Sequence, residues 1–97
     1  MSNREILRTD TVSVRIMELE RGTATEWHYH TEVNDFFVCL EGVVLIETRE
    51  PERSVALFPG QQAEVSPLAV HRVLNNPVVN SRYLLIQGVG RYDFITV

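Results

Sequence analysis

The chain has 97 residues, of which 44% are hydrophobic and 23% are charged. This composition is typical of one soluble domain, and a chain of this length can build one core but not two, so residues 1–97 are interpreted as a single domain. One cysteine, Cys39, excludes an internal disulfide framework and a zinc ribbon built on thiolates, and a reducing, cytoplasmic setting is expected.

The charges exclude further classes of protein. All nine basic residues are arginines, and thirteen acidic residues bring the formal net charge to -4. Without lysine, Schiff-base and P-loop chemistry are excluded, and because the arginines are scattered, no nucleic-acid partner is expected. The apolar runs, such as residues 43–46, are too short to cross a bilayer, so no membrane partner is expected either.

The hydrophobic pattern predicts an all-β fold. Short runs rich in Val, Ile, Tyr and Phe recur about every ten residues, separated by Gly, Pro, Asn or Asp, and no apolar stripe at helical spacing lasts for three turns. In chain order, strands are predicted at residues 5–9, 12–19, 25–30, 35–41, 43–49, 54–58, 62–65, 70–74, 82–88 and 92–96.

So many short strands would leave many exposed edges unless the sheets close on themselves. A compact jelly-roll barrel is therefore the favoured architecture. An up-and-down barrel of the lipocalin type is the alternative, although it normally needs longer strands.

The three histidines are His28, His30 and His71. On a strand, residues two apart point to the same face, so the side chains of His28 and His30 can grip one ion. Asp35 precedes the apolar run 36–40, and a hairpin turn would bring it back beside the pair as a further ligand. The alternative is that the pair is exposed by chance and that His71 is a solvated or core histidine.

Glycines frame these residues in a recognisable spacing. The first stretch resembles the first cupin signature, with Asp where that family usually has Glu. It runs Gly22, five residues, His28, one residue, His30, four residues, Asp35, six residues, Gly42.

A second stretch, with Gly60, five residues, Ser66, His71, three residues and Asn75, resembles the second cupin signature. Here the family usually has proline at the position of Ser66 and glycine at that of Leu68. A different path of the turn before His71 is therefore expected.

The resemblance to cupins implies a double-stranded β-helix, that is, a jelly-roll barrel, with a metal held near its mouth. The implied ligands are His28, His30, Asp35 and His71. Three imidazoles and one carboxylate suit Fe, Mn, Ni or Zn as divalent ions. Because Asp is one methylene shorter than Glu, Asp35 is expected to be the weakest ligand or to bind through water.

Alternation along the strands predicts the wall of the site. Phe37 and Cys39 share a face with Asp35, and Val73 shares a face with His71, so a mostly apolar pocket for a small molecule is expected. Glu26 lies two residues before His28 and is interpreted as a general base, an acceptor for a ligand or, more simply, a solvated rim residue.

Trp27 and Tyr29 alternate with the histidines and are expected to form an outward-facing aromatic pair. Monomers seldom leave such a pair in water, so a homodimer with these two residues in its interface is predicted.

Two functions remain open from the sequence. The first is a metal-dependent enzyme, a dioxygenase or an isomerase, decarboxylase or hydrolase, that acts on a small enolisable acid or phenolic molecule. The second is a non-catalytic module that binds or senses a small molecule or a metal.

Overall fold

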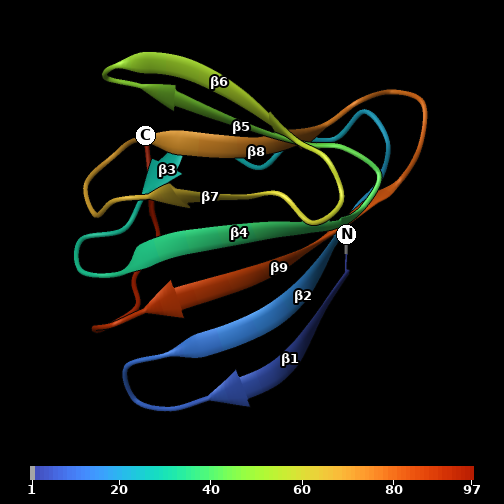
Figure 1. Ribbon diagram of the computed structural model, residues 1–97. Helices are drawn as coiled ribbons and strands as arrows, with labels where there is room; N and C mark the ends of the chain where they lie inside the picture. Colours follow the sequence, from blue (N-terminus) through green and yellow to red (C-terminus); the bar gives the residue numbers. More distant parts are fainter. Residues whose placement is uncertain (1) are drawn as a thin grey trace.

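The structure is a computed structural model that describes residues 2–97. Two antiparallel five-stranded sheets face each other, the first with strand order β1-β2-β9-β4-β7 and the second with order β10-β3-β8-β5-β6 (Figure 1). The strands are β1 (Ser2–Arg8), β2 (Ser13–Leu19), β3 (His28–Tyr29), β4 (Asn34–Glu41), β5 (Val44–Arg49), β6 (Glu52–Leu57), β7 (Gln62–Val65), β8 (His71–Asn75), β9 (Ser81–Gly88) and β10 (Ile95–Thr96).

The predicted all-β jelly roll is confirmed, and each predicted strand has a counterpart. The third strand is much shorter than predicted, His28–Tyr29 instead of residues 25–30. The backbone before it leaves the regular ladder, since the carbonyl of Glu26 accepts a hydrogen bond from a histidine ring rather than from a strand. Within residues 2–97, no helix is long and apolar enough to span a membrane.

The core lies between the sheets. Alternation turns one face of each strand inward, and the buried hydrophobic side chains on these faces are at most 6% exposed. The buried hydrophobic residues are Leu19, Phe37, Cys39, Val44, Ile46, Leu57, Val65, Val73, Tyr83 and Leu85.

A buried polar network supports the end of the barrel that contains Gly42 and Asn75. The Asn75 amide donates to the carbonyl oxygens of Leu19 and Val79, and its Oδ1 accepts a 2.6 Å hydrogen bond from Ser81. Ser81 in turn bonds the backbone of Val43. Asn75, the last residue of the second glycine-framed stretch, therefore has a structural role.

The outer face of the first sheet is also apolar. Two rows of side chains cross β2, β9 and β4 in register, and they point away from the second sheet. The rows are Val14, Ile86 and Phe36, and Ile16, Leu84 and Val38.

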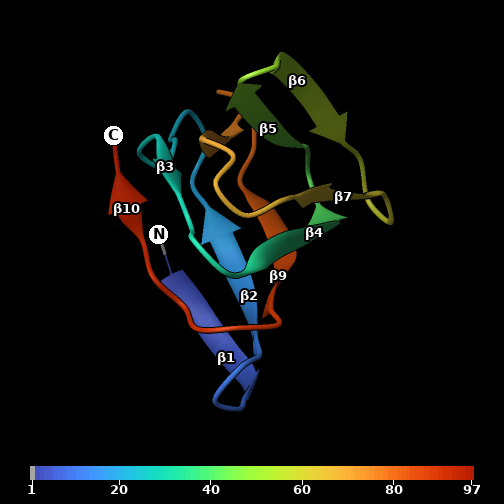
Figure 2. The same cartoon turned by 90° about the vertical axis from the view of Figure 1, so that its left-hand side faces the viewer.

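The C-terminal segment connects the two sheets. After β9 in the first sheet, the chain crosses to β10, which pairs with β3 in the second sheet (Figure 2). This crossing brings residues 92–94 against the rings of His28 and His30.

Gly42 tests the packing at this end of the barrel, because its φ is positive and other atoms lie close to its Cα. Gly42 has a φ of 74°, and a Cβ there would lie 2.5 Å from Ser81 Oγ and 2.8 Å from the Asn80 carbonyl oxygen. Gly42→Ala should lower the free energy of unfolding by about 2–4 kcal/mol, the sum of a left-handed backbone and overpacking.

Gly60 is the matched control for that variant. It has a φ of 88°, but a Cβ there would meet nothing within 4 Å. Gly60→Ala should therefore lose only about 1–2 kcal/mol, the backbone cost alone. Equal losses in the two variants by urea denaturation would contradict the packing described for Gly42.

Candidate metal centre

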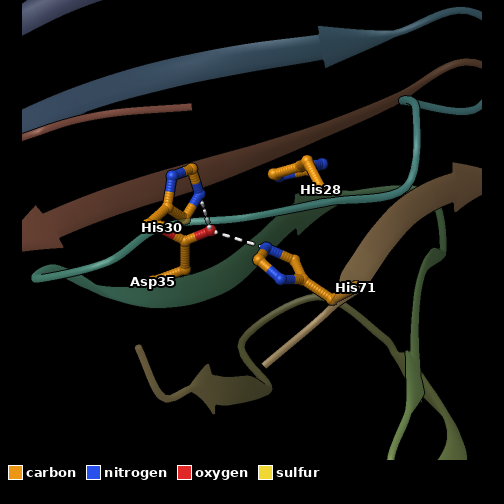
Figure 3. A group of neighbouring side chains, drawn as sticks. All are labelled: His28, His30, Asp35 and His71. Carbon is orange, nitrogen blue, oxygen red and sulfur yellow. Dashed lines mark hydrogen bonds and ion pairs between the residues drawn. The ribbon is translucent and has the colours of Figure 1, made fainter. Parts of the chain in front are cut away.

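Four buried polar side chains converge between the two sheets (Figure 3). His28 and His71 face each other in register on β3 and β8 of the second sheet, and Asp35 comes from β4 of the first sheet. His30 follows β3 directly. All four are at most 5% exposed, and their ligand atoms lie within 4.8 Å of one another.

Each imidazole is oriented by a hydrogen bond from Nδ1 to a backbone carbonyl. Because a carbonyl oxygen can only accept, Nδ1 must carry the proton in all three rings, which leaves Nε2 as the atom available to a ligand. The pairs are His28 with Glu26 at 2.6 Å, His30 with Asp93 at 2.6 Å, and His71 with Ala69 at 2.8 Å.

The Asp35 carboxylate reaches the middle of the group. Its Oδ2 lies 2.9 Å from Nε2 of His71 and 3.1 Å from Nε2 of His30 (Figure 3). Its other oxygen, Oδ1, accepts a 2.9 Å hydrogen bond from the Gln87 side chain. The side chain that is one methylene shorter than glutamate therefore still meets the imidazoles.

The charges of the group are distributed unequally. Burial lowers the pKa of His28 to about 4, so this ring is neutral at neutral pH. Burial also disfavours a charge on His30, but the hydrogen bond and the negative charge of Asp35 outweigh it and raise the pKa of His30. Although burial opposes ionisation of Asp35, hydrogen bonds from His30 and His71 hold the pKa of its carboxyl well below the ordinary range.

This donor set fits a divalent transition metal. Atoms that share an ion at about 2.1 Å lie at most about 4.2 Å apart, so only a small contraction of the group is needed. The three inward Nε2 atoms and one carboxylate oxygen are ligands that such ions prefer, and an ion would displace the proton that His30 shares with Asp35.

A cavity of about 210 Å³ opens next to the group. His28, His30 and Asp35 line it, whereas His71 is almost fully buried and does not. Phe37 and Val73, which alternation predicted to face the site, do line it. The space suits a small molecule beside the four side chains.

Cys39 lies elsewhere than the sequence suggested, whereas the exposed Glu26 agrees with its interpretation as a solvated rim residue. Cys39 does point inward, but its thiol contacts the carbonyl oxygens of Glu41 and Gly42, deeper along β4, and it does not line the cavity. The Glu26 side chain is exposed, and alternation fails there because β3 begins only at His28. Glu26 serves the site through its backbone carbonyl.

The turn before His71 contains the expected irregularity. Leu68, which stands where the second signature usually has glycine, adopts a left-handed φ of 71° and is 65% exposed. Its backbone N–H donates to the carbonyl of His30 at 2.7 Å. The next carbonyl, of Ala69, holds the His71 ring, so the turn positions His71 despite the substitution.

The sequence interpretation missed eight residues of the cavity wall, which are Arg15, Met17, Thr25, Tyr83, Leu85, Gln87, Tyr92 and Phe94. Arg15 and Gln87 are polar residues on the inward, mostly apolar faces of β2 and β9. Alternation along these strands could have identified both as inward-facing. Tyr92 and Phe94 come from the C-terminal crossing, and the Phe94 ring stacks on His28 with centroids 4.2 Å apart. Met17 adds further apolar wall.

Solved structures share this architecture. An uncharacterized conserved protein with a double-stranded β-helix domain from Klebsiella pneumoniae is 18% identical, with a TM-score of 0.84, over 99% of this chain and 83% of that one. A cupin protein from Bacteroides fragilis is 17% identical, with a TM-score of 0.78, over 92% and 77% of the two chains. The polyketide cyclase RemF from Streptomyces resistomycificus is 19% identical, with a TM-score of 0.84, over 98% and 69%.

At these identities the likeness shows the fold alone. No curated protein matches the sequence. The cupin domain family model, however, matches residues 15–86, which include both glycine-framed stretches and all four converging side chains. The chain therefore belongs to the cupin family.

Proposed function

We propose that this cupin binds one divalent transition metal through His28, His30, Asp35 and His71, and that it is an enzyme acting on a small enolisable acid or phenolic molecule. The observation that carries the proposal is the orientation of the rings: three backbone carbonyls fix Nδ1, so three Nε2 atoms converge beside a cavity. A core histidine has no need of such convergence.

The residues divide the work of such a site. A bound Fe, Mn, Ni or Zn ion would polarise a substrate oxygen as a Lewis acid. The Phe37, Val73 and Phe94 side chains line the cavity, and with a ligand in place these apolar side chains would keep water from it and strengthen the electrostatic interactions inside. The reaction is then of the dioxygenase type or of the isomerase, decarboxylase or hydrolase type.

Turnover distinguishes this proposal from the alternative of a non-catalytic binding or sensing module. Protein loaded separately with Fe(II), Mn(II), Ni(II) and Zn(II) is offered catechols, diketones and keto acids, while dioxygen uptake and product formation are followed. Conversion by wild type, lost in His30→Ala, supports an enzyme. Saturable binding of these compounds without conversion supports the binding module instead.

Metal retention tests the ligand assignment. His30→Ala should abolish stoichiometric metal in protein purified without an affinity tag, because two Nε2 atoms and one carboxylate hold an ion much less tightly. Glu26→Ala is the matched control, since only the backbone carbonyl of Glu26 serves the site, and it should keep full metal content. Full occupancy in His30→Ala by elemental analysis would contradict the assignment.

Metal binding should also release protons. Because Asp35 raises the pKa of His30, part of the metal-free protein carries a proton on Nε2 that an ion must displace. The affinity for the metal should therefore fall as the pH drops through the raised pKa of His30. At His28, whose pKa is about 4, protons compete with the metal only at lower pH. Calorimetric titration at pH 7 in two buffers of different ionisation enthalpy measures the release; identical heats would contradict it.

A homodimer remains our proposal for assembly, and the surroundings of Trp27 bear on where its interface lies. The guanidinium carbons of Arg49 and Arg72 lie 4.3 Å and 4.7 Å from the centre of the Trp27 ring, so side chains of its own chain shield part of it. The outer face of the first sheet, with Phe36 37% exposed beside Ile86, is a second apolar surface that an interface can use.

Two charge insertions tell these surfaces apart. Phe36→Glu should give a monomer by light scattering at micromolar concentration, because it places a charge in the apolar row. If the interface is the outer face of the first sheet, Tyr29→Glu should remain a dimer. If the interface includes Trp27 and Tyr29, as the sequence predicted, Tyr29→Glu should be a monomer. A monomeric wild type would overturn the homodimer altogether.

A further inference from the structure

The wall of the cavity contains one cation, Arg15. It projects from β2 on the inward face, opposite Leu85 of β9, and its side chain lines the cavity together with His28, His30 and Asp35. Among residues 2–97, Arg15 takes part in no ion pair, because no carboxylate lies within salt-bridge distance of its guanidinium. Arg15 is therefore a half-buried positive charge without a negative partner.

The hydrogen bonds of Arg15 aim it at the metal ligands. Its Nη2 donates to Oε1 of Gln87 at 2.5 Å, and Nε2 of the same Gln87 donates to Oδ1 of Asp35 at 2.9 Å. Gln87 is only 3% exposed, so it holds a fixed bridge between the cation and the carboxylate. One amide group thus separates Arg15 from Asp35, a proposed ligand of the metal.

The protein does not satisfy the guanidinium fully. Gln87 and the Tyr92 side chain hydrogen-bond it, and the centroid of the Tyr92 ring lies 6.0 Å from the guanidinium carbon, but its buried Nε has no partner. A buried donor without a partner costs free energy, and a charge-assisted hydrogen bond to an anion would offset that cost once the side chain turns Nε toward the cavity.

Arg15 can be reached from a second side. Together with Gln87 and Tyr92 it also lines a neighbouring cavity of about 330 Å³, which lies against the loop of residues 9–13. The cation therefore stands where the two cavities adjoin, and an anionic group can meet it without passing the apolar wall.

The wall of the metal cavity around Arg15 is apolar. Met17, Leu85 and Phe94 line it, so the body of a ligand bound to Arg15 would lie against hydrophobic side chains. With neutral imidazoles, a divalent ion, one carboxylate and Arg15 sum to a charge of about +2, which favours an anion over a neutral molecule.

We propose that Arg15 is the specificity-determining residue of this site: it pairs with the carboxylate of the substrate, which is a small organic acid with an apolar body. The inference rests on the proposed function and narrows it, because it selects acids over neutral phenols and ketones. Gln87 sets the position of the guanidinium relative to Asp35, and the acid places a second oxygen toward the three Nε2 atoms.

Two probes that differ in charge at a single group test the assignment. Salicylate and salicylamide have the same ring and phenol oxygen, but only the first has a carboxylate. Their affinities for zinc-loaded protein are measured by calorimetry, together with metal content and melting temperature. Wild type should bind salicylate at least about tenfold more tightly, as expected for a hydrogen-bonded ion pair.

The variants separate Arg15 from the metal. Arg15→Gln keeps a donor for Gln87 but removes the charge, and should bind the two probes equally while retaining its metal. Arg15→Lys keeps the charge without the planar fork and should retain part of the preference. Arg4→Met, at an exposed position on β1, is the matched control and should behave like wild type.

The outcomes are distinct from those of the proposed function. If wild type binds both probes equally, binds neither, or if Arg15→Gln keeps the preference for salicylate, Arg15 does not select a carboxylate and the inference is overturned. If the protein holds no metal, the proposed metal site fails, while the preference of the metal-free protein and its loss in Arg15→Gln still decide the role of Arg15.

Discussion

Three hydrogen bonds from imidazole Nδ1 atoms to backbone carbonyls determine what the centre of this barrel can do. Each fixes the tautomer and the plane of one ring, so that Nε2 points inward. The carbonyls belong to Glu26, Ala69 and Asp93, three segments that are far apart in the sequence. The site is therefore complete only when the barrel is closed and the C-terminal segment has crossed from one sheet to the other.

That requirement explains several departures from regular strand geometry. β3 is reduced to His28–Tyr29 because the preceding backbone turns its carbonyl to the His28 ring. Leu68 takes a left-handed φ because the turn there must present the carbonyl of Ala69 to His71. The Asp93 side chain bonds the backbone N–H of Thr31, which fixes the crossing segment beside His30. Local irregularity in each case serves the orientation of a ligand.

The fold and the pairing of His28 with His30 were predictable because both depend on local spacing. Alternation places His28 and His30 near one another, and the glycines that permit left-handed turns mark the strand ends, as Gly42 does at a φ of 74°. The convergence of Asp35 and His71 on this pair was implied by the resemblance to cupins. The distance from the Asp35 carboxylate to the rings depends on how two sheets pack, which the length of one side chain does not determine.

The rest of the site depends on contacts that no short motif encodes. Phe94 and Tyr92 reach the rings because of the path of the C-terminal segment, and Trp27 is partly shielded because Arg49 and Arg72 flank it from neighbouring strands. Cys39 shares a face with Phe37 but lies deeper in the core, since alternation gives the face and not the depth. Arg15 and Gln87 lie within reach of sequence reasoning, because a charged or amide residue on an inward face needs a partner or a ligand.

X-ray absorption spectroscopy of the metal-loaded protein tests the central claim most directly. If the three oriented rings and Asp35 hold one ion, the spectrum must show three imidazole nitrogens and at least one oxygen bound to the metal at about 2.0–2.2 Å. Fewer than three imidazoles in a stoichiometrically loaded sample, or bonded sulfur from Cys39, would contradict the claim that the Nδ1 hydrogen bonds prepare these side chains for a metal.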